Sequence, residues 1–178
     1  MENNNEFKDY KIFYTDCRHG NLEAVKRHYL NGADLSFNNN QALIIAASSG
    51  QLLIVQYLVS MGVNIGANFY QAIKCASKYG HLLVVQYLML KMENNDTNND
   101  KNNDTNNYTN NQVFKIACGG GHIHIVKYMI DKGINIDAIG QDSIELAKKY
   151  GQQHLVDYLT KIIFETPMTD NDSKQNIL

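Results

Sequence analysis

The sequence predicts an all-α protein: an α-solenoid of about five stacked helix–turn–helix repeats with short connectors and a disordered Asn-rich insertion. Three observations predict this class. Glycines recur with three gaps of 30 residues and one of 41, at Gly20, Gly50, Gly80, Gly121 and Gly151. A large apolar residue stands seven positions before each of them, at Phe13, Leu43, Ile73, Phe114 and Ile144. A valine stands five positions after each, at Val25, Val55, Val85, Val126 and Val156. A period of this size indicates an array of identical supersecondary units.

The residues before each glycine predict a first short helix. In the second unit Leu43, Ala46 and Ala47 are spaced i, i+3 and i+4, which is one face of a helix. Alanine is also a strong helix former. Gly50 then stands where a left-handed residue would end this helix.

The residues after the glycine predict a second, amphipathic helix. Gln51 to Met61 carries Leu52, Val55, Leu58 and Val59 on one side, and Gly62 stands at its end. Isolated helices shorter than about 12–15 residues are marginal in water. Each unit therefore needs a neighbour to cover its apolar face, and stacking follows from the sequence.

The period divides the chain into units, an insertion and two tails. We expect units at about 10–40, 41–70, 71–111, 112–141 and 142–164, with polar tails at 1–9 and 165–178. Residues 93–111 repeat a four-residue pattern such as Asn-Asn-Asp-Thr and hold almost nothing apolar. This composition predicts a disordered loop in place of the connector between the third and fourth units. Repeat slippage in a tolerated loop is favoured over a partner-binding role.

The first and last units depart from the apolar pattern. Positions that hold small residues in the middle units hold Asp16 in the first unit and Lys148 in the last. In the first unit Arg27 and His28 also stand where the second unit has an aromatic and an apolar residue. Terminal units of an array need a polar outer face. We therefore interpret both units as ends that meet water.

Composition limits the class of function. The formal net charge is -2, which gives no overall attraction to nucleic acid or to a membrane surface. The longest apolar run, Leu52 to Val59, is too short to span a bilayer. The chain starts without the features of a secretion signal, and its three cysteines cannot all pair. We expect a monomeric intracellular protein, cytoplasmic or nuclear, with reduced thiols.

These residues together resemble the ankyrin repeat over roughly residues 10–164. The matching stretches are Leu43 to Gly50, Lys78-Tyr79-Gly80-His81, Gly119-Gly120-Gly121-His122 and Asn31-Gly32-Ala33-Asp34-Leu35. The family's opening Thr-Pro dipeptide is missing, and the period is 30 rather than 33. Because the missing residues fall in the connectors, we expect tight loops instead of paired β-hairpins. The short period and the Asn-rich insertion are similar to the ankyrin families of giant DNA viruses of amoebae.

Several residues could carry chemistry but have a structural interpretation that we favour. Cys118, His122 and His124 have a spacing that metal ligands also use. Cys118 fits a small core position, and His122 follows its glycine as in the family pattern. Gly119-Gly120-Gly121 lacks the Lys-Ser/Thr of a phosphate loop and predicts a tight turn. We predict no catalytic residue, no metal site and no cofactor.

The resemblance implies a protein-interaction module that binds a protein partner through its concave face. The predicted partner-binding residues stand just before the turn glycines: Arg18, His19, Ser48, Ser49, Lys78, Tyr79, Lys149 and Tyr150. Their cations and aromatics favour an acidic protein segment as the partner, although cations are also favoured at helix ends by the helix dipole. Two alternatives stay open: a metal-binding or hydrolytic protein that uses Cys118, His122 and His124, and a degenerate paralogue without a retained partner.

Overall fold

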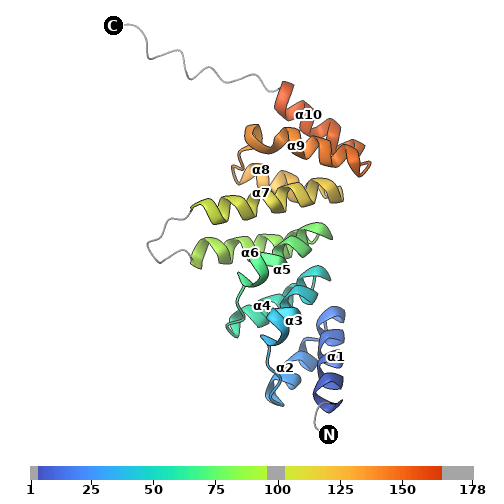
Figure 1. Ribbon diagram of the computed structural model, residues 1–178, viewed down its shortest axis with the longest axis vertical. Coiled ribbons are helices and arrows are strands. Elements are labelled where there is room, and N and C mark those ends of the chain that lie inside the picture. Colours follow the sequence, from blue (N-terminus) through green and yellow to red (C-terminus); the bar gives the residue numbers. More distant parts are fainter. Residues whose placement is uncertain (1–3, 96–102, 166–178) are drawn as a thin grey trace, which may run out of the picture.

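The computed structural model describes residues 4–95 and 103–165, and these residues form helices and turns without strands (Figure 1). The helices form five consecutive pairs: α1 (Asn4–His19) with α2 (Leu22–Leu30), α3 (Phe37–Ser48) with α4 (Leu52–Ser60), α5 (Ala67–Lys78) with α6 (Leu82–Asn95), α7 (Asn103–Gly120) with α8 (Ile123–Asp131), and α9 (Ile136–Lys149) with α10 (Gln153–Glu165).

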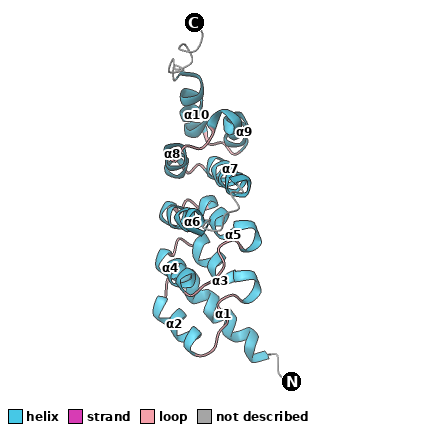
Figure 2. Ribbon diagram, turned by 90° about the vertical axis from the view of Figure 1, so that its left-hand side faces the viewer, coloured by secondary structure: helices cyan, strands magenta, loops and turns pink. Residues whose placement is uncertain are grey.

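The pairs stack into an array of two layers (Figure 2). The first helices of the pairs form one layer, in which α1, α3, α5, α7 and α9 each pack on the next. The second helices form the other layer, in which α2, α4, α6 and α8 follow in order. The predicted all-α solenoid of helix–turn–helix units is confirmed.

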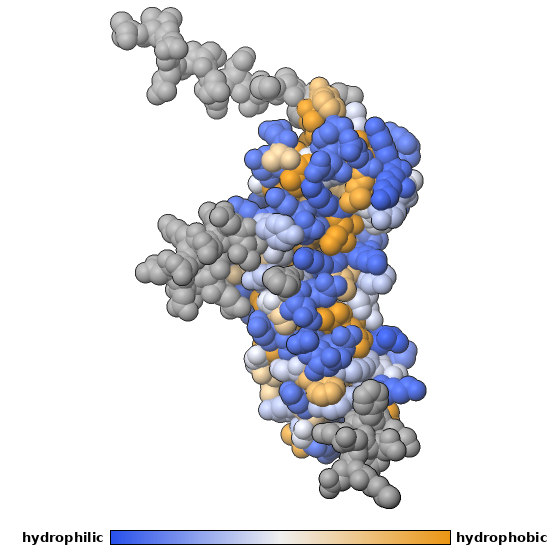
Figure 3. Space-filling model, in the orientation of Figure 1, coloured by the Kyte–Doolittle hydropathy of each residue, from blue (hydrophilic) through white to orange (hydrophobic). Residues whose placement is uncertain are grey.

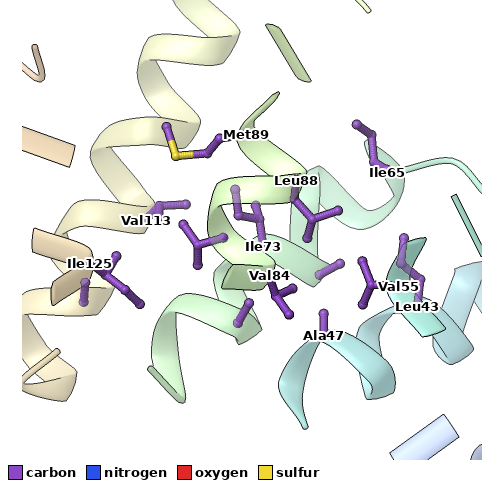
Figure 4. Close-up of a cluster of buried hydrophobic side chains, with 14 of the residues drawn as sticks. Leu43, Ala47, Val55, Ile65, Ile73, Val84, Leu88, Met89, Val113 and Ile125 are labelled. Carbon is purple, nitrogen blue, oxygen red and sulfur yellow. The ribbon is translucent and has the colours of Figure 1, made fainter. Parts of the chain in front are cut away.

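The core follows the repeat period. The apolar residues seven positions before the turn glycines are at most 3% exposed, and the valines five positions after them at most 6%. In Figure 4 the side chains of Leu43, Val55, Ile73 and Val113, which come from three successive units, lie in one continuous interior. Each unit therefore covers its apolar face with the next unit, as the sequence predicts.

The turn glycines end the helices as predicted. Gly50 has φ +71°, the left-handed region that a side chain disfavours. The backbone N–H of Gln51 donates to the carbonyl of Ala46 at 2.9 Å, and that of Gly50 donates to Ala47 at 3.2 Å. This pair of bonds is the Schellman motif, which satisfies carbonyls at the end of a helix. Gly62, with φ +85°, ends α4 in the same left-handed conformation.

The connectors are tight loops, and the described residues hold no β-hairpin. Asn38, Asn39 and Asn40 have φ values of 53°, 56° and 62°, so the right-handed part of α3 begins only after them. Asparagine tolerates this left-handed conformation better than most residues. The side chain of Asn40 donates to the carbonyl of Asn64 at 3.2 Å, which joins this connector to the next one.

The Asn-rich insertion differs from its prediction. Helix α6 continues to Asn95 and α7 begins at Asn103, so the expected disordered loop over 93–111 is wrong at both ends. Residues 96–102 lie outside the described part of the chain. The reason for the helix is tertiary packing: Thr109 is only 2% exposed, and Asn110 and Asn111 are half-buried. Contacts with neighbouring helices stabilise a segment whose composition alone disfavours a helix.

The terminal units carry charge as predicted. Lys148 is exposed. Asp16 is half-buried and accepts hydrogen bonds from the side chains of Asn21 at 2.9 Å and His28 at 3.0 Å. The first unit therefore replaces a buried apolar contact by a polar cluster.

Among residues 4–95 and 103–165, no helix has the length and apolar character that crossing a membrane requires.

Candidate functional site

The predicted partner-binding residues lie at the C-terminal ends of the first helices, where α1, α3, α5 and α9 meet their turns. Because these helices pack in sequence, their ends form a row along one edge of the array. We call the two positions before each turn glycine the turn row: Arg18, His19, Ser48, Ser49, Lys78, Tyr79, Gly119, Gly120, Lys149 and Tyr150.

Hydrogen bonds between successive units hold the turn row in line. The side-chain amide of Gln51 donates to the carbonyl of Arg18 at 3.0 Å. The Nε2 atom of His81 lies 3.0 Å from the carbonyl oxygen of Ser48. His122 repeats this contact with Lys78 at 2.8 Å, and His154 with Gly121 at 3.2 Å. A carbonyl oxygen can only accept, so each ring nitrogen must donate.

Two lysine–tyrosine pairs are the most prominent side chains of the turn row. Tyr79 is 54% exposed and Tyr150 is 59% exposed. The Nζ atom of Lys78 lies 5.6 Å from the ring centroid of Tyr79, and that of Lys149 lies 5.9 Å from the centroid of Tyr150. Neither lysine forms an ion pair with a carboxylate of the described residues. Both charges are therefore available to a partner.

The two pairs are separated by a stretch of bare backbone in the fourth unit. A Cβ atom added at Gly119 would lie 3.3 Å from the ring of Tyr150. One added at Gly120 would lie 3.1 Å from the carbonyl oxygen of Lys78. The glycines thus allow Tyr150 and the third unit to approach the α7 terminus closely, which a larger residue would obstruct.

The second unit contributes least to the turn row. Arg18 and His19 are exposed, whereas Ser48 and Ser49 are half-buried. The hydroxyl of Ser48 donates to the carbonyl of Ile45 at 2.9 Å, so it already has a partner within its own helix. The structure brings all the predicted residues to one edge, but its charge is concentrated in the first, third and fifth units.

One further cation near the turn row was missed from the sequence. Lys74 stands one helical turn before Lys78 on α5, and its Nζ atom lies 5.9 Å from the ring centroid of Tyr108. Residues 67–78 contain these two lysines and no carboxylate. The i, i+4 spacing of the lysines was the signal that could have identified Lys74.

The residues of the alternative metal site have other roles. Cys118 is fully buried, and burial raises the pKa of its thiol to about 12. The Nε2 atom of His122 is bonded to the carbonyl of Lys78, while His124 is exposed. Across residues 4–95 and 103–165 no three His, Cys, Asp or Glu side chains gather as metal ligands would. Nothing in this geometry favours the alternative.

The tyrosines that recur in the second helices pack against the core. Tyr57, Tyr87, Tyr128 and Tyr158 are all partly buried against it. Burial raises the pKa of Tyr87, Tyr128 and Tyr158.

The face of the array drawn in Figure 3 is mostly hydrophilic, and its apolar residues form separate patches. A polar partner suits this face better than a broad apolar one.

A stacked array of helix pairs with an exposed edge of turns defines the class of repeat proteins that bind partners along an extended surface. Comparison with known families is consistent with this class: residues 13–100 match the family model of ankyrin repeats in three copies. The family match therefore applies to residues 13–100, a little under half of the chain. The matched stretch starts at Phe13, the first residue of the repeating apolar position. A search of curated proteins found no relative that matches the chain.

Proposed function

We propose that this protein is a non-enzymatic interaction module whose turn row, on the concave side of the array, binds an acidic segment of a protein partner. Ankyrin repeats are in general protein–protein interaction modules. The observation that carries the proposal is the pair of exposed lysine–tyrosine sites, Lys78 with Tyr79 and Lys149 with Tyr150. The intracellular setting and the origin in a viral ankyrin family stay predictions.

The chemistry of the turn row supports an acidic partner. Lys78 and Lys149 have no intramolecular carboxylate partner in the described part of the chain, so binding need not break an ion pair. Lys74 adds a third cation on the same side of α5 as Lys78. Tyrosines beside these cations provide large rigid contact surfaces, which interfaces favour.

The bare backbone between the pairs suits an extended segment. Adjacent packed helices lie about 8–10 Å apart, so the third and fifth units are separated by roughly 16–20 Å. An extended chain advances about 3.3 Å per residue. A segment with two acidic residues about five or six positions apart could therefore reach both lysines while its middle passes Gly119 and Gly120.

Affinity capture tests this proposal. The full-length protein is used as bait in a lysate, and the recovered proteins are compared with those captured by Lys78→Glu/Lys149→Glu. A partner that binds at the turn row should be lost or weakened at least about tenfold, because two attractive contacts become repulsive. Acidic peptides from the recovered partner should compete with it.

A matched control changes net charge equally elsewhere. Lys127 and Lys161 are exposed on the second helices. The variant Lys127→Glu/Lys161→Glu should retain the partner. If both double variants retain it equally, the turn row is not the binding site.

A further inference from the structure

The central first helices carry lysines without acidic side chains to balance them. No Asp or Glu occurs in α3, in α5 or in residues 105–120 of α7. The same stretches carry Lys74, Lys78 and Lys115. Figure 2 shows these helices in one layer on the same side of the array. Positive charge is therefore concentrated on this layer, next to the turn row that includes Lys78.

Lys115 occupies in the fourth unit the position that Lys74 occupies in the third. Each stands six residues before its turn glycine, Gly80 or Gly121. Because α5 packs on α7, equivalent positions on the two helices lie about 8–10 Å apart. Both lysines are half-buried, and a lysine in this setting packs its stem on the protein while its ammonium group stays in water.

Lys115 differs from Lys74 in having an acidic partner within the chain. Lys74 forms no ion pair with another described residue. The Nζ atom of Lys115 lies 2.6 Å from the Oδ2 atom of Asp142 on α9. The side chain of Asp142 is 67% exposed and that of Lys115 is 28% exposed. Water screens an ion pair this exposed, so it contributes little to stability and another carboxylate can take the place of Asp142.

We propose that Lys115 is a further contact of the acidic segment and that Asp142 competes with the segment for this lysine. The proposal rests on the function proposed for the turn row. In the free protein Asp142 supplies the carboxylate that α7 lacks around Lys115. On binding, a Glu or Asp side chain of the partner replaces Asp142, which returns to solvent. Asp142 therefore lowers the affinity for every acidic segment and favours those with a carboxylate opposite Lys115.

The positions of Lys78 and Lys115 define the spacing that such a segment needs. The two residues stand on neighbouring helices about 8–10 Å apart, and they differ by four helical positions, or about 6 Å along the axis. Their backbone positions are thus separated by roughly 11 Å, which an extended segment covers in about three or four residues. We expect two acidic residues of the partner at this spacing.

A nucleic-acid strand fits this surface less well than a protein segment. Each nucleotide carries a charged phosphate, and beyond α7 the carboxylates of Asp142 and Glu145 are exposed on α9. These carboxylates would repel a continuous polyanion. A protein segment can carry its acidic residues only where the lysines lie.

Fluorescence anisotropy with a labelled peptide of alternating Glu and Ser, about 12 residues long, tests the proposal on the full-length protein. Asp142→Asn keeps the size of the side chain and should tighten binding about two- to fivefold, because it frees Lys115. Lys115→Gln should weaken binding, and Asp142→Asn added to Lys115→Gln should bring no gain. Asp157→Asn removes an exposed carboxylate from α10 as a matched control and should leave the affinity unchanged.

The outcomes separate this inference from the function proposed for the turn row. If Lys78→Glu/Lys149→Glu abolishes binding while Asp142→Asn has no effect, the turn row stands and the role of Asp142 is wrong. The inference is also wrong if Asp157→Asn, or Asp142→Asn in the presence of Lys115→Gln, tightens binding as much as Asp142→Asn alone. Absence of binding by both the wild type and Asp142→Asn would overturn both proposals. A single-stranded oligonucleotide that binds more tightly than the peptide and responds to the same substitutions would assign the surface to nucleic acid instead.

Discussion

The ring of His81 occupies the space that a side chain on Gly50 would need. A Cβ atom added at Gly50 would lie 2.5 Å from the Nδ1 atom of His81, well inside van der Waals contact. The same ring donates through Nε2 to the carbonyl of Ser48 at 3.0 Å. Gly50 is therefore required twice, by its left-handed backbone and by the histidine of the next unit. The recurrence of glycine thus follows from contact between units as well as from the turn within one unit.

Replacing Gly50 by alanine should destabilise the array more than the same change at Gly62. Both residues have positive φ, so each change places a Cβ atom on a left-handed backbone, which costs about 1–2 kcal/mol of stability. Only Gly50 has a neighbour in the way, since a Cβ at Gly62 meets nothing within 4 Å. Urea denaturation of Gly50→Ala and Gly62→Ala measures the difference. Equal losses would show that His81 moves aside without cost.

The hydrogen bond from His81 to the preceding unit should be replaceable by glutamine. Gln51 already makes the equivalent contact with the carbonyl of Arg18. We expect His81→Ala to lower the free energy of unfolding by about 0.5–1.5 kcal/mol and His81→Gln to lower it less. Thermal or urea denaturation of both variants checks this order. Equal destabilisation by alanine and glutamine would indicate that the ring acts through packing alone.

Asp16 should make stability depend on pH at the acidic end. Burial alone would raise the pKa of Asp16, but hydrogen bonds from Asn21 and His28, together with the charges of His28 and Arg27, hold that pKa below its usual value. The folded state thus binds the proton less tightly than the unfolded state. The resulting stabilisation is present above the unfolded pKa of about 3.9 and is lost as pH falls through the lower folded pKa.

Comparison of the wild type with Asp16→Asn tests this dependence. The variant should be less stable at pH 7 and should show a shallower loss of stability on acidification below pH 4. Denaturation midpoints measured from pH 7 to pH 3 give both quantities. Parallel curves for the two proteins would show that Asp16 does not contribute.

The three cysteines should react with a thiol reagent at different rates. Cys17 and Cys118 are fully buried, and burial raises the pKa of each thiol to about 12. The thiolate is the reactive form, so both should react slowly at pH 8 in the folded protein. Cys75 is only half-buried and should react first. Mass spectrometry after brief maleimide treatment identifies the labelled residue. Equal labelling of Cys118 and Cys75 would contradict the burial of Cys118 and reopen the metal-binding or hydrolytic alternative.

The insertion shows where prediction from composition fails. Asn-rich segments bury little apolar surface, and this property correctly predicts weak local structure. A prediction from composition does not take account of the surfaces that neighbouring helices provide for packing. Thr109 is almost fully buried, and α7 is helical from Asn103 onwards. The surroundings of Asn110 could not have been anticipated, because a surface hollow beside it is lined by residues of four helices, among them Met89, Met129 and Ala138.

The turn row combines local features with contacts between units. The position of Lys78 and Lys149 before their glycines was readable, because helix period and turn chemistry are local properties. The contact between Tyr150 and Gly119 could not be predicted from the sequence, because it joins two units. The role of His122 could not be predicted either, because its hydrogen bond to the carbonyl of Lys78 spans 44 residues of sequence.

The sequence by itself determined the repeat, the two-helix unit, its glycine turns and its buried face, because these depend on periodicity and local backbone preference. Only the tertiary structure decided which side chains link successive units, how far α6 and α7 extend, and which polar groups remain without partners. These features depend on contacts between residues about 30 or more positions apart, and a pattern within one unit carries no information about them.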